Sequence, residues 1–352
     1  MLKQNINPVV FEDIESVVST RLNWERFKNK TILITGANGF IASYLVYTFL
    51  YLNEKKNINC KIVGVSRNKI KAEARFQSLL ERNDLQIIIA DVSQSFRIEE
   101  KADFIIHAAS QASPKYYGTD PVGTLNANVL GTNNLLELAK KNNAESFLFF
   151  SSAEVYGSVE ADKIPVKEHD FGYLDINNVR SCYAEGKRLG ETMCVSWAQQ
   201  YKIPVKIVRP FHTYGPGMDL QDGRVYADFI ADVVNNRNIV MKSDGLATRA
   251  FCYLKDATEA FIKVLLDGEN GEAYNVGNPD EEISVVDLAE KLTALFPEKK
   301  LVVDKQTVSD AGYLKSVIVR SSPDVQKIRV LGWKPSTSVS DGFTRTIKSY
   351  LS

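Results

Sequence analysis

A tyrosine and a lysine four residues apart are the pair in this sequence best suited to chemistry. Tyr183 and Lys187 stand in the stretch Tyr-Ala-Glu-Gly-Lys, in an apparent helix that Leu189 and Met193 continue. Positions four apart share one helical face, so the two side chains can act together. A free tyrosine, with a pKa of about 10, is a poor base at neutral pH, and a nearby ammonium favours the phenolate. The pair predicts a general base; a solvated pair on a surface helix is the alternative.

A serine and a glutamate follow a strand-like run. The apolar residues 147–150 end in Ser151-Ser152-Ala153-Glu154. Catalytic groups gather at strand ends of this kind. Ser152 is placed to hydrogen-bond a hydroxyl or carbonyl that is oxidised or reduced, and Glu154 points to the same side if the chain stays extended. The alternative is a strand-capping serine and a solvated glutamate.

The first strand-like run, 31–34, leads into a glycine-containing turn and then a helical pattern. Gly36 permits a tight turn, Gly39 lets the backbone approach a pyrophosphate, and Ala42 is small enough for the helix to press on the strand. Backbone N–H groups and the helix dipole then meet the negative charge. Because the turn directly joins a strand to a helix, the sequence predicts a dinucleotide site.

The end of the second strand bears on the kind of dinucleotide. An acidic residue there would bind the adenosine ribose of NAD, but this chain has Ser66 and Arg67. Arg67 could clamp a 2′-phosphate or stack on adenine, which leaves NADP open. Asp91 and Val92, after the third strand, are placed to touch adenine, unless Asp91 is an ordinary turn residue.

These groups need a scaffold, and six apolar runs alternate with helical patterns to provide it. The runs are 31–34, 61–65, 85–89, 104–107, 147–150 and 205–208, and helical periodicity fills segments such as 41–51 and 124–141. Nearly continuous apolar runs are typical of parallel strands covered on both faces. The pattern predicts an α/β fold, a Rossmann-type doubly wound parallel sheet with right-handed crossovers.

Three segments divide the chain. Residues 1–28 form an N-terminal extension whose apolar spacing predicts a short amphipathic helix, residues 29–209 the dinucleotide-binding domain, and residues 210–352 mainly a smaller substrate-binding lobe with some segments returning to the first domain. The apolar spacing is that of Phe11, Ile14, Val17, Val18 and Leu22.

Composition excludes several classes of protein. The 352 residues carry 43 basic and 43 acidic side chains, which gives no general attraction to nucleic acid or an anionic membrane.

The sequence has neither CxxC spacing nor clustered histidines, so it suggests no metal site and no disulfide framework. Residues 1–28 lack the pattern of a signal peptide, and no run of about 18 apolar residues suggests a membrane span. We expect a cytoplasmic protein. The four cysteines are Cys60, Cys182, Cys194 and Cys252.

With these pieces in line, the chain resembles the extended short-chain dehydrogenases that modify nucleotide sugars, from about residue 29 to its end. The closest likeness is to UDP-glucuronate decarboxylases (UDP-xylose synthases). Four stretches carry it: Ala-Ser-Gln-Ala-Ser-Pro-Lys-Tyr at 109–116, Glu-Val-Tyr-Gly at 154–157, Arg-Ser-Cys-Tyr-Ala-Glu-Gly-Lys-Arg at 180–188, and Tyr-Gly-Pro-Gly-Met at 214–218 through Asp-Gly-Arg-Val at 222–225.

The resemblance implies a cycle in which the cofactor is used and returned. Tyr183 takes the proton of the sugar 4-hydroxyl while hydride passes to the nicotinamide, and Lys187 lowers the tyrosine pKa and holds the nicotinamide ribose. A 4-keto group β to a carboxylate eases loss of CO2, and Glu154 positions the sugar or handles a water. Such a cycle favours tightly bound NAD, with NADP kept open by Arg67. The substrate is a nucleotide-diphosphate sugar, UDP-linked by this likeness, and a homodimer forms through a helix bundle that includes the Tyr183 helix.

The glycine-containing turn and the family resemblance together indicate the binding residues. The cofactor set is Gly36, Asn38, Gly39, Phe40, Ile41, Ser66, Arg67, Asp91, Val92, Ala108, Ala109, Asn128, Ser151, Tyr183 and Lys187. The substrate set is Ser113, Lys115, Tyr116, Glu154, His212, Gly223, Arg224, Val225, Arg249 and Arg320. Arg249 matches a family arginine that contacts the substrate, as a ligand of the diphosphate or the carboxylate, and Arg320 matches a second family arginine near the diphosphate. Two guanidinium groups suit two phosphates. Taken alone, each is an ordinary surface charge.

The chain departs from the family pattern at three places. Ser66-Arg67 replaces an acidic residue, and His212 replaces the usual asparagine that contacts the substrate diphosphate. Ala153 stands where 4,6-dehydratases carry an aspartate, which disfavours dehydration.

Three other functions stay open. A 4-epimerase needs Ser152, Tyr183 and Lys187 but not Glu154. An NADPH-dependent 4-ketosugar reductase would explain Arg67. A non-catalytic dinucleotide-binding protein would have no use for a paired phenol and ammonium.

Overall fold

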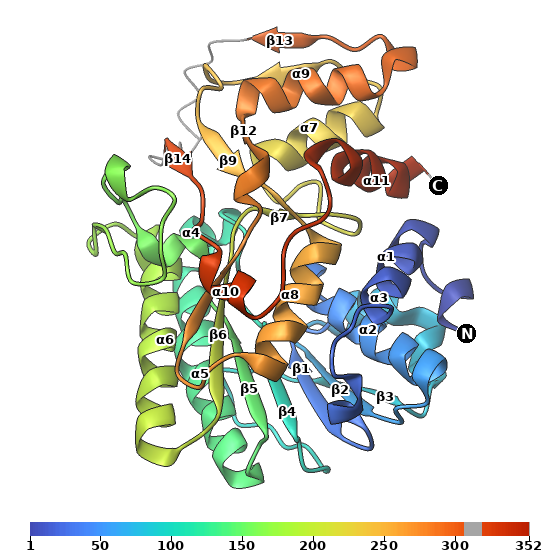
Figure 1. The fold of residues 1–352 in the computed structure, drawn as a ribbon, viewed down its shortest axis with the longest axis vertical. Helices are drawn as coiled ribbons and strands as arrows, with labels where there is room; N and C mark the ends of the chain where they lie inside the picture. Colours follow the sequence, from blue (N-terminus) through green and yellow to red (C-terminus); the bar gives the residue numbers. More distant parts are fainter. Residues whose placement is uncertain (306–318, 352) are drawn as a thin grey trace.

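A seven-stranded parallel sheet forms the centre of the molecule. The computed structural model describes residues 1–305 and 319–351. The strand order is β11-β6-β5-β4-β1-β2-β3, and every neighbouring pair is parallel. All six predicted strands are present, and the doubly wound α/β prediction is confirmed (Figure 1). The strands are β1 (Thr31–Thr35), β2 (Lys61–Ser66), β3 (Leu85–Ile89), β4 (Phe104–His107), β5 (Ser146–Phe150), β6 (Val205–Pro210) and β11 (Ala273–Val276).

Helices cover both faces of this sheet, and alternate residues of each strand face opposite layers. In β1, Ile32 and Ile34 join the core under α1, α2 and α8, whereas Leu33 joins the core under α5 and α6. Helices α5 and α6 pack along each other on their face. The helices named here are α1 (Pro8–Val18), α2 (Phe40–Lys56), α5 (Pro121–Asn142), α6 (Ser181–Tyr201) and α8 (Leu254–Asp267).

A smaller lobe lies beyond the carboxyl ends of the strands (Figure 1). Its own core contains Tyr214, Phe251 and Phe343, with the rings of Tyr214 and Phe343 stacked at 4.0 Å. The chain returns from this half to the main sheet through α8 and β11, while the boundary at residue 210 stays a prediction. The lobe contains β7 (Thr213–Tyr214), α7 (Val225–Val234), β8 (Ile239–Met241), β9 (Thr248–Ala250), β10 (Cys252–Tyr253), β12 (Glu282–Ser284), α9 (Val285–Leu295), β13 (Val303–Lys305), β14 (Arg320–Ser321) and α11 (Val339–Leu351).

Short helices complete the described chain. The α-helical ones are α3 (Lys69–Phe76), α4 (Lys115–Thr119) and α10 (Gln326–Val330). The 3-10 helices are Leu2–Gln4, Trp24–Phe27, Gln77–Glu81, Ala153–Tyr156, Ala161–Lys163, Pro279–Glu281 and Pro297–Lys299.

The predicted N-terminal helix is present as α1. Asn7 caps it by accepting a hydrogen bond from the Val9 amide at 3.0 Å, and Pro8 fills the first helical position, where a missing N–H costs nothing. Ile14 and Val17 are buried, but Leu22 lies beyond the end of the helix.

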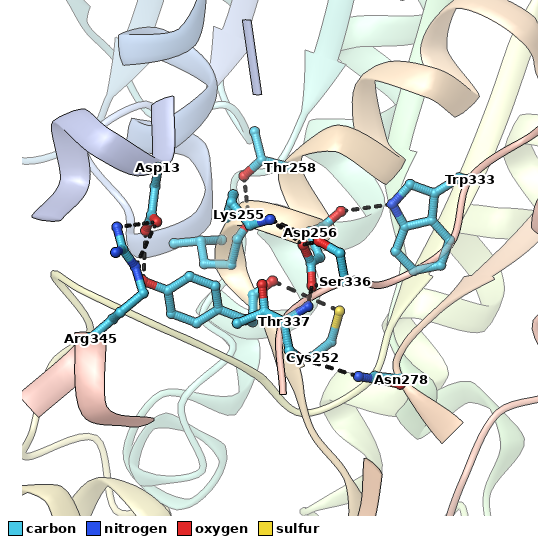
Figure 2. A network of polar contacts seen from close by, with 12 residues as sticks. Asp13, Cys252, Lys255, Asp256, Thr258, Asn278, Trp333, Ser336, Thr337 and Arg345 are labelled. Carbon is cyan, nitrogen blue, oxygen red and sulfur yellow. Dashed lines mark hydrogen bonds and ion pairs between the residues drawn. The ribbon is translucent and has the colours of Figure 1, made fainter. Parts of the chain in front are cut away.

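One carboxylate joins this helix to both parts of the molecule. Asp13 is 1% exposed. It accepts hydrogen bonds from the hydroxyls of Tyr44 in α2 at 3.2 Å and Tyr253 in β10 at 2.7 Å. It also accepts from the Arg345 guanidinium of α11 at 2.8 Å and 3.1 Å (Figure 2). Burial raises the pKa of Asp13, and the bonds from Tyr253 and Arg345 oppose that rise.

A second buried carboxylate fastens the segment that precedes α11 (Figure 2). Asp256 in α8 accepts hydrogen bonds from the backbone amides of Ser336 at 3.0 Å and Thr337 at 2.7 Å, and from the Ser336 hydroxyl at 2.9 Å. The Trp333 indole donates to the Asp256 carbonyl at 3.0 Å. The two carboxylates therefore hold the last described helix against the main domain.

We predict that Asp13→Asn lowers the free energy of unfolding by about 2–4 kcal/mol, because bonds to a buried charged group are lost and Arg345 loses its buried partner. Urea unfolding measures this change. Glu12→Gln is the matched control: Glu12 pairs with the same Arg345 at 3.0 Å, but its side chain is 63% exposed, so its loss should cost less than about 1 kcal/mol. Equal effects of the two substitutions would contradict the prediction.

Candidate active site

A cleft of about 680 Å³ opens at the carboxyl ends of the central strands. This edge is where open α/β sheets bind ligands, and the volume suits a small-molecule site. Loops after β1, β2, β4, β5 and β6 line it together with the segment that leads into α7. The predicted residues that line the cleft are Gly36, Asn38, Gly39, Phe40, Ile41, Arg67, Ala108, Ser113, Lys115, Tyr116, Ser151, Ser152, Glu154, Tyr183, Lys187, His212 and Arg224.

The turn between β1 and α2 fits a dinucleotide pyrophosphate. Gly36 has φ +66°, and a Cβ there would lie 2.8 Å from the Ala109 Cα, so a larger residue is excluded. Gly39 is the N-cap of α2 and provides no side-chain capping bond. The first N–H groups of a helix need such a partner, and an anion can provide it. The residues present therefore fit the predicted cofactor.

A buried histidine braces this turn. The His107 Nδ1 and the Thr35 Oγ1 are 2.9 Å apart, and the same Oγ1 accepts a hydrogen bond from the Ala109 amide at 3.2 Å. Burial lowers the pKa of His107 to about 3, helped by the charge of Lys187. The imidazole is therefore neutral, and the Thr35 hydroxyl can donate to its Nδ1. This chain of bonds holds the loop after β4 against Gly36.

The predicted base and its lysine both lie in the cleft on α6. Tyr183 is 6% exposed and Lys187 is 2% exposed. The Lys187 Nζ donates a hydrogen bond of 2.6 Å to the Phe150 carbonyl at the end of β5, and it lies 5.8 Å from the centre of the Tyr183 ring. Burial lowers the pKa of Lys187 to about 7. The lysine can therefore change its protonation state near neutral pH.

The acidity of Tyr183 is set by several neighbours. Burial raises its pKa to about 12, a hydrogen bond with the Ser152 side chain lowers it, and the nearby charges of Glu154 and Arg224 act in opposite directions. Ser152 and Arg224 lower this pKa. The predicted lowering by Lys187, whose ammonium donates to the Phe150 carbonyl, stays a prediction.

Ser152 and Glu154 face the cleft by a different route from the one predicted. The chain does not stay extended after β5, so that premise is wrong. It forms the 3-10 helix Ala153–Tyr156, which Ser152 caps by accepting a hydrogen bond from the Glu154 amide at 3.2 Å. Both side chains still line the cleft, and the Glu154 carboxylate lies 3.7 Å from the Arg180 guanidinium.

A second tyrosine, which the sequence did not single out, stacks on the base. The rings of Tyr117 and Tyr183 have centroids 5.1 Å apart and planes inclined by 16°. Tyr117 is 2% exposed, and its hydroxyl donates to the Ala112 carbonyl at 3.0 Å. The Arg180 guanidinium lies 5.7 Å from the centre of the Tyr117 ring. This packing fixes the plane of the Tyr183 ring.

The loop before α7 connects the second lobe to the rim of the cleft. Arg224 donates to the Ala112 carbonyl at 3.2 Å and to the Tyr226 hydroxyl at 3.0 Å. The Ser113 hydroxyl donates to the Asp222 carbonyl at 2.7 Å. Lys115 and Asp219 form an ion pair at 3.4 Å across the same junction. The predicted substrate residues of both lobes therefore meet here.

His212 lies in the cleft with an unusual backbone. Its φ is +29°, in the left-handed region that few residues other than glycine adopt. Its ring packs near Phe251, and its buried Nε2 has no partner among the described residues. Burial lowers the pKa of His212 to about 3, and the charges of Arg249 and Arg224 add to the effect. The ring is therefore neutral and offers one N–H or one lone pair to a ligand.

Other predicted residues lie outside the lining of the cleft. Arg320 forms a two-point ion pair with Glu282 at 2.8 Å and 3.0 Å, and Arg249 donates to the Thr248 carbonyl at 2.8 Å. Asp91 accepts hydrogen bonds from the amide and hydroxyl of Ser93, as an ordinary turn residue does. The full set outside is Ser66, Asp91, Val92, Ala109, Asn128, Gly223, Val225, Arg249 and Arg320. Their binding roles stay predictions.

Sequence reasoning missed part of the lining. Lys71 and Arg75 come from α3, four residues apart, a spacing that repeats the step from Arg67. That periodicity is the one signal that could have found them. The other missed residues are Ser110, Gln111, Ala112, Pro114, Tyr117, Phe150, Ala153, Pro210, Thr213, Gly217, Met218, Asp219, Asp222 and Tyr226.

The described residues contain neither a cluster of metal-binding side chains nor a helix fit to cross a membrane. Residues 1–305 and 319–351 contain no group of three or more His, Cys, Asp or Glu side chains arranged to hold a metal ion. Over the same ranges no helix has both the length and the apolar character needed to cross a bilayer. The four cysteines are buried and unpaired.

Comparisons with known proteins agree with this geometry. A sequence profile of the NAD dependent epimerase/dehydratase family matches residues 32–277. UDP-glucuronic acid decarboxylase 3 of Arabidopsis thaliana is 35% identical over 316 residues, which cover 89% of this chain and 87% of that protein. UDP-glucuronic acid decarboxylase 1 of Xenopus tropicalis is 33% identical, over 90% of this chain and 71% of the relative.

Solved structures give the same fold. An epimerase of Methanothermobacter thermautotrophicus has a TM-score of 0.79 and 22% identity, with 97% of this chain and 96% of that chain covered. The UDP-glucuronic acid 4-epimerase of Bacillus cereus, solved with UDP-glucuronic acid and NAD, has a TM-score of 0.73 and 25% identity, with coverage of 91% and 99%.

The lowered pKa of His212 predicts a pH-dependent stability. Its pKa is about 3 in the folded chain and about 6.5 when unfolded, so the unfolded state binds more protons below pH 6.5. The stabilisation is complete above that pH and is lost as pH falls toward 3. Between pH 7.5 and 5.5 the loss of unfolding free energy should be about 1 kcal/mol smaller in His212→Asn than in the wild type.

Urea unfolding at the two pH values measures the difference. His169→Asn, which removes a histidine whose side chain is 79% exposed, is the matched control. Identical pH dependence in His212→Asn and the wild type would show that His212 is not held neutral by the fold.

Proposed function

The chain belongs to the NAD dependent epimerase/dehydratase family, and on that premise we propose that it oxidises the C4 hydroxyl of a nucleotide sugar and decarboxylates UDP-glucuronate. One observation carries the proposal: Tyr183, Ser152 and Lys187 line the same cleft as the Gly36–Gly39 turn. Relatives of up to 35% identity that match most of the chain are UDP-glucuronic acid decarboxylases, which supports the choice of reaction.

NAD is the cofactor of this proposal. Gly36, Gly39 and the first turn of α2 would hold the pyrophosphate, and Lys187 would hold the ribose next to the nicotinamide. Buried polar atoms without partners among the described residues, such as the Ser151 Oγ beside Lys187, are available for further bonds. When bound, NAD supplies the acceptor for the hydride that leaves C4.

The residues of the chain provide the proton chemistry. The Tyr183 oxygen takes the proton of the 4-hydroxyl, and Ser152, already hydrogen-bonded to that phenol, stabilises the negative charge. Because burial raises the pKa of Tyr183 to about 12, the phenolate depends on positive charge nearby. Arg224 supplies part of this charge, and Lys187 supplies more if its ammonium turns from the Phe150 carbonyl toward the reacting sugar.

Loss of CO2 follows from the ketone at C4. The ketone is β to the C6 carboxylate, so the C5–C6 bond can break with its electron pair passing to the ketone oxygen. Tyr183, now protonated, can donate a hydrogen bond to that oxygen. C5 then needs a proton, and Glu154, which lines the cleft and pairs with Arg180, would hold a water that provides it. Return of the hydride to C4, with the proton of Tyr183 passing to the C4 oxygen, would restore both the hydroxyl and the phenolate.

A 4-epimerase is the second candidate. Ser152, Tyr183 and Lys187 would serve it equally, and the Bacillus cereus 4-epimerase, which was solved with UDP-glucuronic acid, has the same fold. Dehydration has less support, because Ala153 cannot protonate a departing 6-hydroxyl.

Incubation with UDP-glucuronate, with UDP-glucose alongside, tests the proposal. Release of CO2 with formation of UDP-xylose is the expected result. A changed C4 configuration without CO2 would instead establish the epimerase, and consumption of added NADPH in proportion to a keto-sugar would establish a reductase.

We predict that Tyr183→Phe lowers kcat by about 10²–10⁴-fold, because the base is lost, while the dinucleotide still binds. Turnover of UDP-glucuronate and nucleotide content of the purified variant are the two measurements. Tyr173→Phe, at a site 72% exposed and outside the cleft, is the control and should retain full activity. Undiminished turnover in Tyr183→Phe would rule out this phenol as the base.

We also propose that the protein is a homodimer that pairs the outer surfaces of α5 and α6. Large apolar side chains on these two adjacent helices are exposed: Val122, Leu125, Leu130, Leu189, Val195 and Tyr201. Exposed apolar side chains on two neighbouring helices support an interface there. A two-fold axis would place α5 and α6 of one subunit against α5 and α6 of the other.

The dimer proposal predicts that Leu130→Asp with Val195→Glu converts the protein to a monomer, because each charge would be buried twice in a symmetric interface. Light scattering coupled to size-exclusion chromatography measures the mass. Val330→Glu, at an apolar residue of α10 that is 86% exposed, is the control and should leave the mass unchanged. A monomeric wild-type protein at micromolar concentration would contradict the proposal.

A further inference from the structure

Three cationic residues line the cleft beside the dinucleotide turn. Arg67 directly follows β2, and Lys71 and Arg75 lie four residues apart on α3. All three share the lining of the cleft with Gly36 and Gly39. The dinucleotide turn follows β1, and β2 is hydrogen-bonded to β1. The three cations therefore lie on the side of the cleft formed by the end of β2. In sheets of this kind that side receives the adenosine ribose.

Two of these charges have no partner in the described parts of the chain. Neither the Arg67 guanidinium nor the Lys71 ammonium makes a hydrogen bond or ion pair within residues 1–305 and 319–351, whereas Arg75 donates to the Gly217 carbonyl at 3.2 Å. Lys69, also on α3, behaves as a surface residue and pairs with Glu73 at 3.7 Å. Arg67 and Lys71 are therefore available to a ligand in the cleft.

The nearby acidic groups are engaged elsewhere. Asp120 accepts hydrogen bonds from the Gln111 amide group at 2.7 Å and, as the cap of α5, from the Gly123 amide at 3.0 Å. These two bonds lower the pKa of Asp120 most, and the charge of Arg67 adds to the effect. The hydrogen bond from the Gln221 amide lowers the pKa of Asp219 most, and the charges of Lys115 and then Lys71 add to the effect. The ion pair of Asp219 is with Lys115.

A buried serine stands where a carboxylate would bind the ribose of NAD. Ser66, the last residue of β2, is 1% exposed, and its Oγ has no partner among the described residues. A carboxylate at this position would accept from the 2′-hydroxyl and repel a 2′-phosphate. A serine hydroxyl can instead donate to a phosphate oxygen, and an arginine next to it can bind two phosphate oxygens at once.

We infer that Arg67 and Lys71 form a phosphate site for the 2′-position of the adenosine ribose, with Ser66 in place of a repelling carboxylate, so that the cleft accepts NADP as well as NAD. The inference rests on the proposed function only in that a nicotinamide dinucleotide occupies the cleft. Two unpaired cations match the charge of a phosphate dianion, and no carboxylate at position 66 repels it.

Binding measured by calorimetry on nucleotide-free protein tests the site. The probes are NADP against NAD, and adenosine 2′,5′-bisphosphate against AMP, which isolates the contribution of the added phosphate. The bisphosphate should bind at least about tenfold tighter than AMP, with an advantage that shrinks as salt is raised. NADP should bind at least as tightly as NAD.

Variants locate the effect. Arg67→Ala should weaken NADP binding about tenfold and leave NAD binding within about twofold, because only the phosphate contact is lost. Lys71→Ala should act in the same direction, and Lys69→Ala, on the same helix but outside the cleft lining, is the matched control.

The outcomes separate this inference from the proposed function. If NAD binds but NADP binds more than tenfold weaker, or if the bisphosphate binds no tighter than AMP, the phosphate site is overturned and the enzyme assignment stands. If neither dinucleotide binds, the proposed function fails as well. Equal losses of NAD and NADP binding in Arg67→Ala would also overturn the phosphate site.

Discussion

The hydrogen bond from the Lys187 ammonium to the Phe150 carbonyl is the contact on which the geometry of the site depends. It fastens α6 to the carboxyl end of β5, so that Tyr183, one helical turn earlier, meets Ser152 just beyond the strand. The approach is close because Gly190 faces the sheet: a Cβ there would lie 2.5 Å from the Phe149 ring. A buried ammonium needs such a partner, since burial penalises its charge.

The sequence predicted most of the sheet because parallel strands buried on both faces leave continuous apolar runs. The observed bounds of the six predicted strands differ from the predicted ones by at most two residues. The seventh strand, β11, was not identified, and its composition explains why. It is short and contains the buried Asn275, whose side chain donates to the carbonyls of Val166 and Asp324. Because the hydrogen-bond partners of Asn275 are far away in sequence, the hydropathy pattern does not show that this polar residue lies in a core strand.

Site residues whose spacing is set within one helix or one loop were predicted from the sequence, and site residues brought together by tertiary packing were not. The Tyr183–Lys187 spacing and the turn from Gly36 to Gly39 are set by one helix and one loop, so the sequence contains the whole pattern. Tyr117 reaches the cleft through the packing of α4, which no spacing encodes. The premise that the chain stays extended up to Glu154 was wrong, because a 3-10 helix capped by Ser152 provides the hydrogen-bond partner of the Glu154 amide.

The contact between Asp13 and Arg345 joins residues 332 positions apart. A ribosome makes the chain from its first residue, so α1 emerges long before the helix that completes its surroundings. Until α11 is released, the carboxylate of Asp13 has only its tyrosine partners, and the second lobe lacks the helix that presses it onto the main domain. Because domains fold as units during synthesis, the central sheet can form first. The final assembly of the two lobes must therefore wait until α11 has been made.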